Sequence, residues 1–163
     1  MGSGKTYWGR KWAPVADMSF IDLDDEIEKE NQRTIADIFE KDGEEHFRDL
    51  ERKALHATAS NDNCIIACGG GTPCFANNMQ WMKEQGTTVY FQALPQHIYD
   101  RVLEEKDKRP VISKVHPAEL LFFIEQKLKS REPYYEQANM ILPVEELNPD
   151  TINQIVAYKH DNT

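Results

Sequence analysis

The hexapeptide MGSGKT at the start of the sequence constrains the fold of this chain more than any other stretch. Gly4, Lys5 and Thr6 supply the closing G-K-T of the phosphate-binding pattern G-x-x-x-x-G-K-[ST], which lies between a buried strand and a helix. In such a loop, successive backbone N–H groups and the N-terminus of the helix hold phosphate oxygens. The motif therefore predicts a nucleotide-binding turn; the alternative is a glycine-lysine turn at a flexible terminus that imitates it.

The first part of this pattern is missing from the sequence. Its opening glycine would fall two residues before Met1, and the strand that should precede the loop is also absent. We therefore expect either that Met1 is not the native start or that the chain has been truncated.

The length and charge of the chain limit the classes of function that it can have. With 163 residues, it is expected to form a single domain, 1–163, with a real hydrophobic core. The 19 lysines and arginines against 28 acidic residues give a net charge of −9, which argues against a broad nucleic-acid interface. No run approaches the roughly 18 apolar residues of a membrane span, and the N-terminus lacks the apolar region of a signal peptide. We expect a cytoplasmic monomer that binds neither nucleic acid nor membrane.

Short apolar strands alternate with helical stretches along the chain. Strands are expected where apolar, β-branched or aromatic residues cluster, at 19–24, 64–68, 87–93 and 140–143. A helical period of apolar residues occupies 47–57 and 117–130. This alternation predicts an α/β fold with a parallel sheet covered by helices on both faces, which makes three layers.

The segment 25–57 departs from the alternation, because it contains helical pieces but no strand. A single crossover needs only one helix, so we expect this insertion to form a small substrate-binding subdomain. Just before it, Asp22 and Asp24 are expected at the C-terminal end of a strand, with both carboxylates on one face. The alternative is that DLD is an acidic helix cap.

Four further features could bind ligands, and each has a purely structural alternative. Arg48 and Glu51 lie three residues apart on one helix face. The alternative is an ordinary surface ion pair, which contributes little to stability. Gly69–Gly71 follow a strand and expose amides at the edge where α/β folds bind ligands, unless they only form a tight turn. Arg109 lies in a polar stretch that suggests a mobile loop. Arg131 is expected to end a helix, where the helix dipole alone could explain it.

The three cysteines, Cys64, Cys68 and Cys74, lie close together in the sequence. A zinc site needs four ligands at tighter spacing, and His56 is a poor fourth. We therefore interpret them as small buried thiols in a reducing compartment.

Taken together, these motifs resemble the shikimate kinase family. The stretches that carry the resemblance span nearly the whole chain, in the family's order: MGSGKT, FIDLDDEIE, IADIFEKDGEEHFRDLE, IIACGGGTP, RPVI, REPYYEQA and NP. The phosphate loop alone is shared by many nucleotide enzymes, whereas D-x-D, F-R-x-x-E and G-G-G together are much more specific. The resemblance implies a P-loop kinase fold of the nucleoside-monophosphate-kinase type whose first, central strand is missing from this chain. That absence would leave two strands without ladder partners and open a slot in the core.

The resemblance also implies the reaction. It is the phosphorylation of the 3-hydroxyl of shikimate by ATP with Mg²⁺, which gives shikimate 3-phosphate and ADP on the way to chorismate and the aromatic amino acids. The implied ATP-binding residues are Gly2, Ser3, Gly4, Lys5, Thr6, Tyr7, Arg101, Arg109 and Pro149. Arg101 and Pro149 would enclose the adenine, and Arg109 would act from a lid at about 104–116.

The catalytic and substrate-binding roles follow from the same resemblance. The implied catalytic residues are Lys5, Asp24 and Arg109, with Asp24 as the base at the 3-hydroxyl. Thr6 would bind the metal directly and Asp22 would assist through water. The implied shikimate-binding residues are Asp24, Arg48, Glu51, Gly69, Gly70, Gly71 and Arg131. Arg48 and Arg131 would clamp the carboxylate, a role that suits the planar fork of arginine.

Two alternatives remain open at this point. The chain could phosphorylate another hydroxylated small molecule, and convergence of Arg48 and Arg131 near the triple glycine would argue against that. It could also be a catalytically impaired protein that binds ATP or substrate, because the phosphate loop is truncated.

Overall fold

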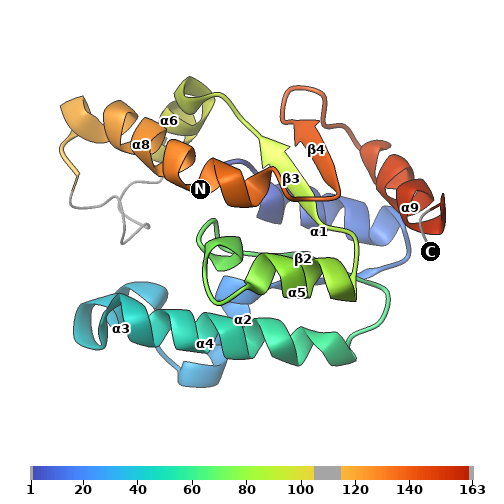
Figure 1. Ribbon diagram of the computed structural model, residues 1–163, viewed down its shortest axis with the longest axis horizontal. Helices are drawn as coiled ribbons and strands as arrows, with labels where there is room; N and C mark the ends of the chain where they lie inside the picture. Colours follow the sequence, from blue (N-terminus) through green and yellow to red (C-terminus); the bar gives the residue numbers. More distant parts are fainter. Residues whose placement is uncertain (1, 105–114, 162–163) are drawn as a thin grey trace.

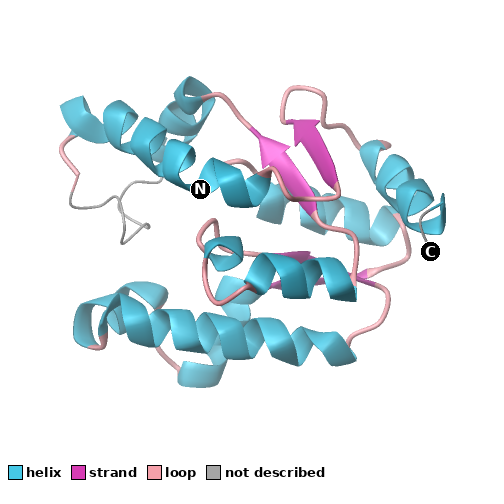
Figure 2. Ribbon diagram, viewed as in Figure 1, coloured by secondary structure: helices cyan, strands magenta, loops and turns pink. Residues whose placement is uncertain are grey.

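The computed structural model describes residues 2–104 and 115–161. The strands in this part of the chain are β1 (Ser19–Asp22), β2 (Cys64–Ala67), β3 (Val89–Gln92) and β4 (Met140–Pro143). Each lies within a stretch that the sequence predicted to be a strand, and helices separate them along the chain (Figures 1 and 2). The predicted α/β fold is therefore confirmed.

The strands form two separate parallel pairs. β1 pairs with β2, with Phe20 opposite Ile65, and β3 pairs with β4, with Phe91 opposite Leu142. Within the described residues, no ladder joins one pair to the other. A cavity of about 430 Å³ is lined by residues of both β2 and β3 and by Trp12. This arrangement agrees with the expected slot in the core.

One hydrophobic core surrounds the β3–β4 pair. The helices that contribute to it are α1 (Lys5–Val15), α6 (Pro95–Glu104), α8 (Pro117–Tyr135) and α9 (Thr151–Asp161). Trp12 of α1 contacts the ring of Phe91 edge-on, with 5.6 Å between ring centroids. Its indole Nε1 also donates a hydrogen bond to the carbonyl oxygen of Asn148 at 2.9 Å. Trp12 thus ties α1 to elements distant in the sequence.

A second hydrophobic core lies on the side of the β1–β2 pair. Its helices are α2 (Leu23–Asn31), α3 (Ile35–Lys41) and α4 (Gly43–Ala57), and α5 (Asn78–Gln85) packs against it. The fully buried side chains include Leu23, Ile27, Ile38 and Leu55. Segment 25–57 contains helices and no strand, as predicted, and its role as a substrate-binding subdomain stays a prediction.

Two element boundaries differ from the sequence prediction. β1 ends at Asp22, and Asp24 lies in the first turn of α2 rather than in the strand. The reason is that Leu23 and Ile27, four residues apart on one helix face, are both fully buried in the second core. Arg131 does not end a helix either, because α8 continues to Tyr135.

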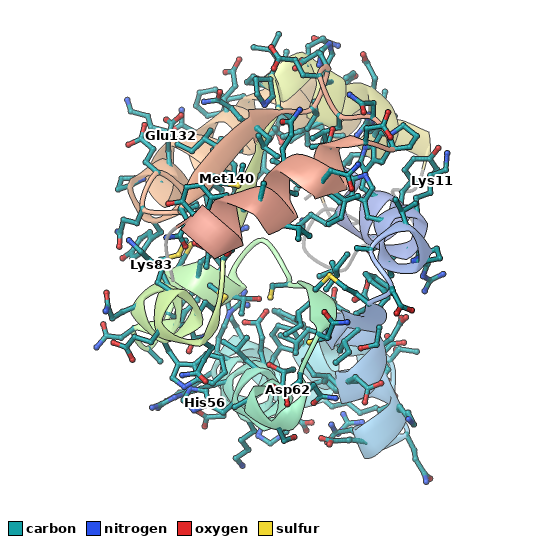
Figure 3. All side chains as sticks on the ribbon, turned by 90° about the vertical axis from the view of Figure 1, so that its right-hand side faces the viewer. Lys11, His56, Asp62, Lys83, Glu132 and Met140 are labelled. Carbon is teal, nitrogen blue, oxygen red and sulfur yellow. The ribbon has the colours of Figure 1, made fainter. Side chains whose placement is uncertain are left out.

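Buried polar groups stand out against a charged exterior. Figure 3 shows Lys11, Lys83 and Glu132 projecting away from the body of the molecule. Glu51, by contrast, is only 1% exposed, and Thr72 is fully buried. Because acidic side chains are almost never fully buried unless paired, Glu51 marks a place where the fold holds a specific charge.

Gly9 is the point where α1 approaches β1 most closely, and a Cβ there would collide with the ring of Phe20. We predict that Gly9→Ala lowers the Tm by several degrees, because overpacking costs about 1–3 kcal/mol and outweighs the gain of about 1 kcal/mol in helix propensity. Gly86→Ala is the control, since a Cβ there meets no described atom within 4 Å. Calorimetry on both variants makes the comparison, and an unchanged Tm for Gly9→Ala would contradict the close packing.

Candidate functional site

The phosphate-binding loop rests on two left-handed glycines. Gly2 has a φ of 62° and Gly4 a φ of 86°, and Gly4 is the N-cap of α1. Glycine adopts these values without the strain that a side chain would cause. Ser3 between them is buried, and Lys5 Nζ lies 3.4 Å from its hydroxyl oxygen. The loop therefore leads into a helix N-terminus with a lysine beside it, an arrangement that binds anions.

Arg101 reaches this loop from α6. Its Nη1 donates a hydrogen bond to the carbonyl oxygen of Gly2 at 3.3 Å. The side chain of Tyr7 is exposed, with the Lys11 ammonium 4.6 Å from its ring centroid, so its predicted contact with ATP would use the backbone amide. Pro149 is exposed as well. The structure brings Arg101 to the phosphate loop, and enclosure of the adenine between Arg101 and Pro149 stays a prediction.

Thr6 and Asp22 lie side by side at the start of α1 and the end of β1. The Thr6 hydroxyl donates to Asp22 Oδ2 at 2.7 Å, and Asp22 Oδ1 accepts a hydrogen bond from the backbone N–H of Asp24 at 3.1 Å. Asp22 thereby caps α2, so the helix-cap interpretation of DLD holds for this residue. Mg²⁺ is usually held by one or two protein oxygens together with phosphates and water. This oxygen pair beside the phosphate loop fits such an ion.

The Asp24 carboxyl group lies in a crowded acidic environment. Burial, reinforced by the charges of Asp22 and Glu51 and opposed by Lys5, raises the pKa of Asp24 from its ordinary value of 3.8 to about 6. Asp24 Oδ1 also lies 3.6 Å from the position of a Cβ on Gly69, so this carboxyl group is beside the triple glycine. A carboxyl group with a pKa close to the working pH is suited to accept a proton.

Arg48 and Glu51 form a buried ion pair on α4. The distance from Arg48 Nη1 to Glu51 Oε2 is 2.6 Å, and their side chains are 13% and 1% exposed. The same guanidinium group contacts Glu44 at 3.1 Å and lies 4.5 Å from the ring centroid of Phe75. The other carboxylate oxygen of Glu51 accepts a hydrogen bond from the hydroxyl of Thr72 at 2.6 Å. The interpretation of Arg48 and Glu51 as a surface ion pair is therefore wrong.

The triple glycine is needed for close approach between side chains and backbone. A Cβ on Gly71 would lie 2.6 Å from both terminal nitrogens of Arg48, and one on Gly69 would lie 2.8 Å from Glu51 Oε1. Neither glycine has a positive φ, so a side chain here would act by displacing the Arg48 and Glu51 side chains rather than by straining the backbone. A tight turn alone does not account for these contacts.

Arg131 approaches the same loop from α8. Tyr135, one helical turn further on, donates a hydrogen bond to the carbonyl oxygen of Gly70 at 2.5 Å. Burial raises the pKa of both Cys74 and Tyr135, while Arg131 and Arg48 lower it in each case. The Arg48 guanidinium lies against Gly71, and Arg131 lines the same cavity as Gly69 and Gly70, so both arginines lie beside the triple glycine.

Some site residues lie outside the described part or were not predicted. Arg109 and most of the predicted lid, residues 105–114, are outside the described residues. Thr72, Phe75 and Tyr135 contact the site and were missed. Thr72 directly follows the triple glycine and Tyr135 lies within REPYYEQA, so their positions in or beside motifs could have indicated that they belong to the site. No feature of the sequence indicated Phe75.

The three cysteines are half-buried thiols, and none of them is in a disulfide. Burial raises the pKa of Cys68 to about 12, which leaves it as an unreactive thiol at neutral pH. None of the helices in the described ranges is both long and apolar enough to cross a membrane.

Comparison with known proteins places the chain in a family. The family model described as shikimate kinase matches residues 1–159. The chain belongs to the shikimate kinase family. A shikimate kinase of Bacteroides thetaiotaomicron is 40% identical over 147 residues, which cover 90% of this chain and 84% of that protein. A shikimate kinase of Thermoanaerobacter pseudethanolicus is 37% identical over 156 residues, which cover 96% of this chain and 89% of that protein.

Solved shikimate kinase structures share this fold. The crystal structure of the Bacteroides thetaiotaomicron enzyme has a TM-score of 0.85 and 38% identity, covering 99% of this chain and 91% of that one. The shikimate kinase from Acinetobacter baumannii in complex with shikimate has a TM-score of 0.87 and 32% identity, covering 100% and 90%. The resemblance found in the sequence and the P-loop kinase fold that it implied are both confirmed.

The raised pKa of Asp24 has a consequence for the stability of this shikimate kinase family member. The folded protein binds the Asp24 proton more tightly than the unfolded chain does, so ionising this group costs stability as the pH rises from about 4 to about 6. Each pKa unit corresponds to about 1.4 kcal/mol, so the full cost is on the order of 3 kcal/mol. We predict that Asp24→Asn has a Tm several degrees above the wild type at pH 7.5 and close to it at pH 4.

Thermal melts of both proteins across this pH range provide the measurement. Asp25→Asn is the matched control, because Asp25 is exposed and paired with Arg10 at 3.1 Å. A gap in Tm between Asp24→Asn and wild type that does not change between pH 4 and pH 7.5 would refute the raised pKa.

Proposed function

We propose that this chain transfers the γ-phosphoryl group of ATP to the 3-hydroxyl of shikimate, releasing shikimate 3-phosphate and ADP. The observation that carries the proposal is that Arg48 and Arg131 both lie beside the triple-glycine loop, with Asp24 near Gly69 and Lys5 lining the same cavity. Membership of the shikimate kinase family supports it, as does the related structure that contains shikimate. In this role the protein catalyses a step of aromatic amino acid biosynthesis.

The two arginines bind the substrate carboxylate. Each guanidinium group presents paired N–H donors in a plane that matches the two oxygens of a carboxylate. Glu51 holds Arg48 through its short ion pair, and Glu44 contacts the same guanidinium group at 3.1 Å. Because Gly69 and Gly71 have no side chains, the Arg48 guanidinium and the Glu51 carboxylate can lie directly against the loop backbone.

Asp24 acts as the base. With a pKa of about 6, most Asp24 carboxyls are ionised at neutral pH and can accept the proton of the attacked hydroxyl. The hydroxyl oxygen then forms a bond to the γ-phosphorus, the bond between this phosphorus and the β,γ-bridging oxygen breaks, and ADP leaves. Lys5 stays beside the phosphates, where its charge stabilises the transferring group.

The phosphate loop and its neighbours bind MgATP. The backbone from Gly2 to Thr6 holds the phosphates. Thr6 would bind Mg²⁺ directly, and Asp22, which accepts a hydrogen bond from the Thr6 hydroxyl, would assist through water. The ion, when bound, neutralises negative charge on the β- and γ-phosphates. Arg101 approaches the phosphate loop through Gly2. The assignment of Arg109 to a lid over ATP rests on the resemblance, since this residue lies outside the described part.

We also propose a setting for the enzyme: a monomer in the cytoplasm, with ATP and shikimate as its partners. The three cysteines, none of which is in a disulfide, support a reducing compartment. The net charge of −9 supports the absence of a nucleic-acid partner.

The decisive experiment is an ADP-release assay coupled to NADH oxidation, with MgATP and shikimate. Quinate and gluconate are the controls, because they are also hydroxylated carboxylates. We expect turnover with shikimate and little with either control. Faster turnover with quinate or gluconate would point to a different small-molecule kinase. No ADP release with any acceptor, despite measurable ATP binding, would leave a protein that only binds its ligands.

The carboxylate clamp leads to a prediction about two single substitutions. Arg48→Ala and Arg131→Ala should each raise the KM for shikimate by about 30-fold or more while the KM for ATP changes little, because losing one partner of a desolvated charge pair costs about 2–5 kcal/mol. The matched controls are Arg52→Ala on α4 and Lys129→Ala on α8, which remove exposed charges from the same helices. Steady-state kinetics at varied shikimate give both constants.

Arg48→Ala also leaves Glu51 buried without its cation, so its Tm is measured alongside. A folded variant of either arginine that keeps the wild-type KM for shikimate would remove that residue from the substrate site.

A further inference from the structure

Tyr135 connects the two halves of the substrate site. It is the last residue of α8, one turn after Arg131, so both side chains lie on the same helix face. Its hydroxyl donates to the carbonyl oxygen of Gly70 at 2.5 Å, a contact between residues 65 positions apart in the sequence. Its ring packs against Tyr90 of β3, with 4.9 Å between centroids. One side chain therefore spans a helix, a strand and the glycine loop.

The Tyr135 hydroxyl has two neighbours in the site. It donates to Gly70, and the charge of the Arg131 guanidinium, one helical turn away, lowers its pKa. Because a guanidinium group can only donate, the Tyr135 oxygen is the acceptor available to Arg131. Burial raises the pKa of Tyr135, so the hydroxyl keeps its proton at neutral pH and remains a donor to Gly70.

The glycine loop is anchored at its other end in a comparable way. The hydroxyl of Thr72 donates to Glu51, and Glu51 holds Arg48. The amide of Asn78 donates to the Thr72 carbonyl oxygen at 2.9 Å, which fixes the end of the loop. The loop thus lies between two chains of contacts, one leading to Arg48 and the other to Arg131.

We propose that Tyr135 is a positioning residue of the shikimate site, whose hydroxyl holds Arg131 and the glycine loop at the separation that lets Arg131 and Arg48 bind one carboxylate. This inference rests on the proposed function and extends it to a residue that touches neither reacting atom. Tyr135 acts through Arg131 and Gly70, so its loss weakens substrate binding without removing a charge from the site.

Tyr135→Phe tests the proposal, because it keeps the ring that packs on Tyr90 and deletes one oxygen atom. The matched control is Tyr134→Phe, which makes the same change at the neighbouring, exposed tyrosine of the same helix. We expect Tyr135→Phe to raise the KM for shikimate about tenfold, the effect of losing one hydrogen bond to a charged group. The KM for ATP and kcat should change less than twofold, and Tyr134→Phe should match the wild type.

A double-mutant cycle with Arg131→Ala separates positioning from packing. If Tyr135 acts through Arg131, then adding Tyr135→Phe to Arg131→Ala should raise the shikimate KM by less than twofold, because the two changes are coupled. A full tenfold effect in that background would show that Tyr135 does not act through Arg131, and would overturn the proposal.

The remaining outcomes are also distinguishable. If the wild type phosphorylates shikimate and Tyr135→Phe has the same KM as Tyr134→Phe, the positioning role is wrong while the proposed function stands. If Tyr135→Phe loses Tm and both KM values change together, the residue is merely structural. If the wild type shows no turnover with shikimate, the proposed function fails, and the inference about Tyr135 fails with it.

Discussion

The buried carboxylate of Glu51 is the constraint on which the rest of the substrate site depends. A charge that is only 1% exposed must be paired, and the fold satisfies it with the Arg48 guanidinium at 2.6 Å and the Thr72 hydroxyl at 2.6 Å. These short contacts place the ends of both side chains against the backbone of Gly69 and Gly71, where an added Cβ would displace them. These two glycines therefore serve the ion pair as much as the binding of substrate.

The burial and negative charges around Asp24 lower the stability of the fold but suit the carboxyl group to its proposed role as a base. Asp22 and Glu51 both oppose its ionisation, and burial opposes it more strongly than either. A carboxyl group with an ordinary pKa would be less costly to the fold, but it would be a weaker base at neutral pH. Lys5 offsets part of this cost, and its own place is set by the phosphate loop. The charge of Lys5 therefore affects both the proposed binding of nucleotide and the pKa of Asp24. Such coupling is common where active-site groups are clustered.

The sequence was sufficient to predict the strands and the motifs that meet in the candidate site, but not the contacts that align them. Periodicity and motif spacing found the strands and placed Arg48, Glu51 and the glycines, because these are local patterns. The prediction that Asp24 ends a strand was wrong. Burial of Leu23 in the second core decides where α2 begins, and this burial depends on tertiary packing. Tyr135 was missed for a related reason. Its partner Gly70 lies 65 residues away, and nothing local in either stretch indicates that they meet.

The site also depends on how the two strand pairs are held together. No ladder links β2 to β3 in the described residues, so side-chain contacts must fix the pairs relative to each other. Helix α1 supplies one such contact, because it packs on β1 and β2 while Trp12 reaches Phe91 of β3. Tyr135 supplies another, since its ring lies on Tyr90 of β3 and its hydroxyl bonds to the loop after β2. Arg48 lies on α4, which packs on the side of the β1–β2 pair, whereas Arg131 lies on α8, which packs on the side of the β3–β4 pair. The geometry of the carboxylate clamp is therefore set by the same few contacts that join the halves of the fold, and a change in either contact should be felt first in substrate binding.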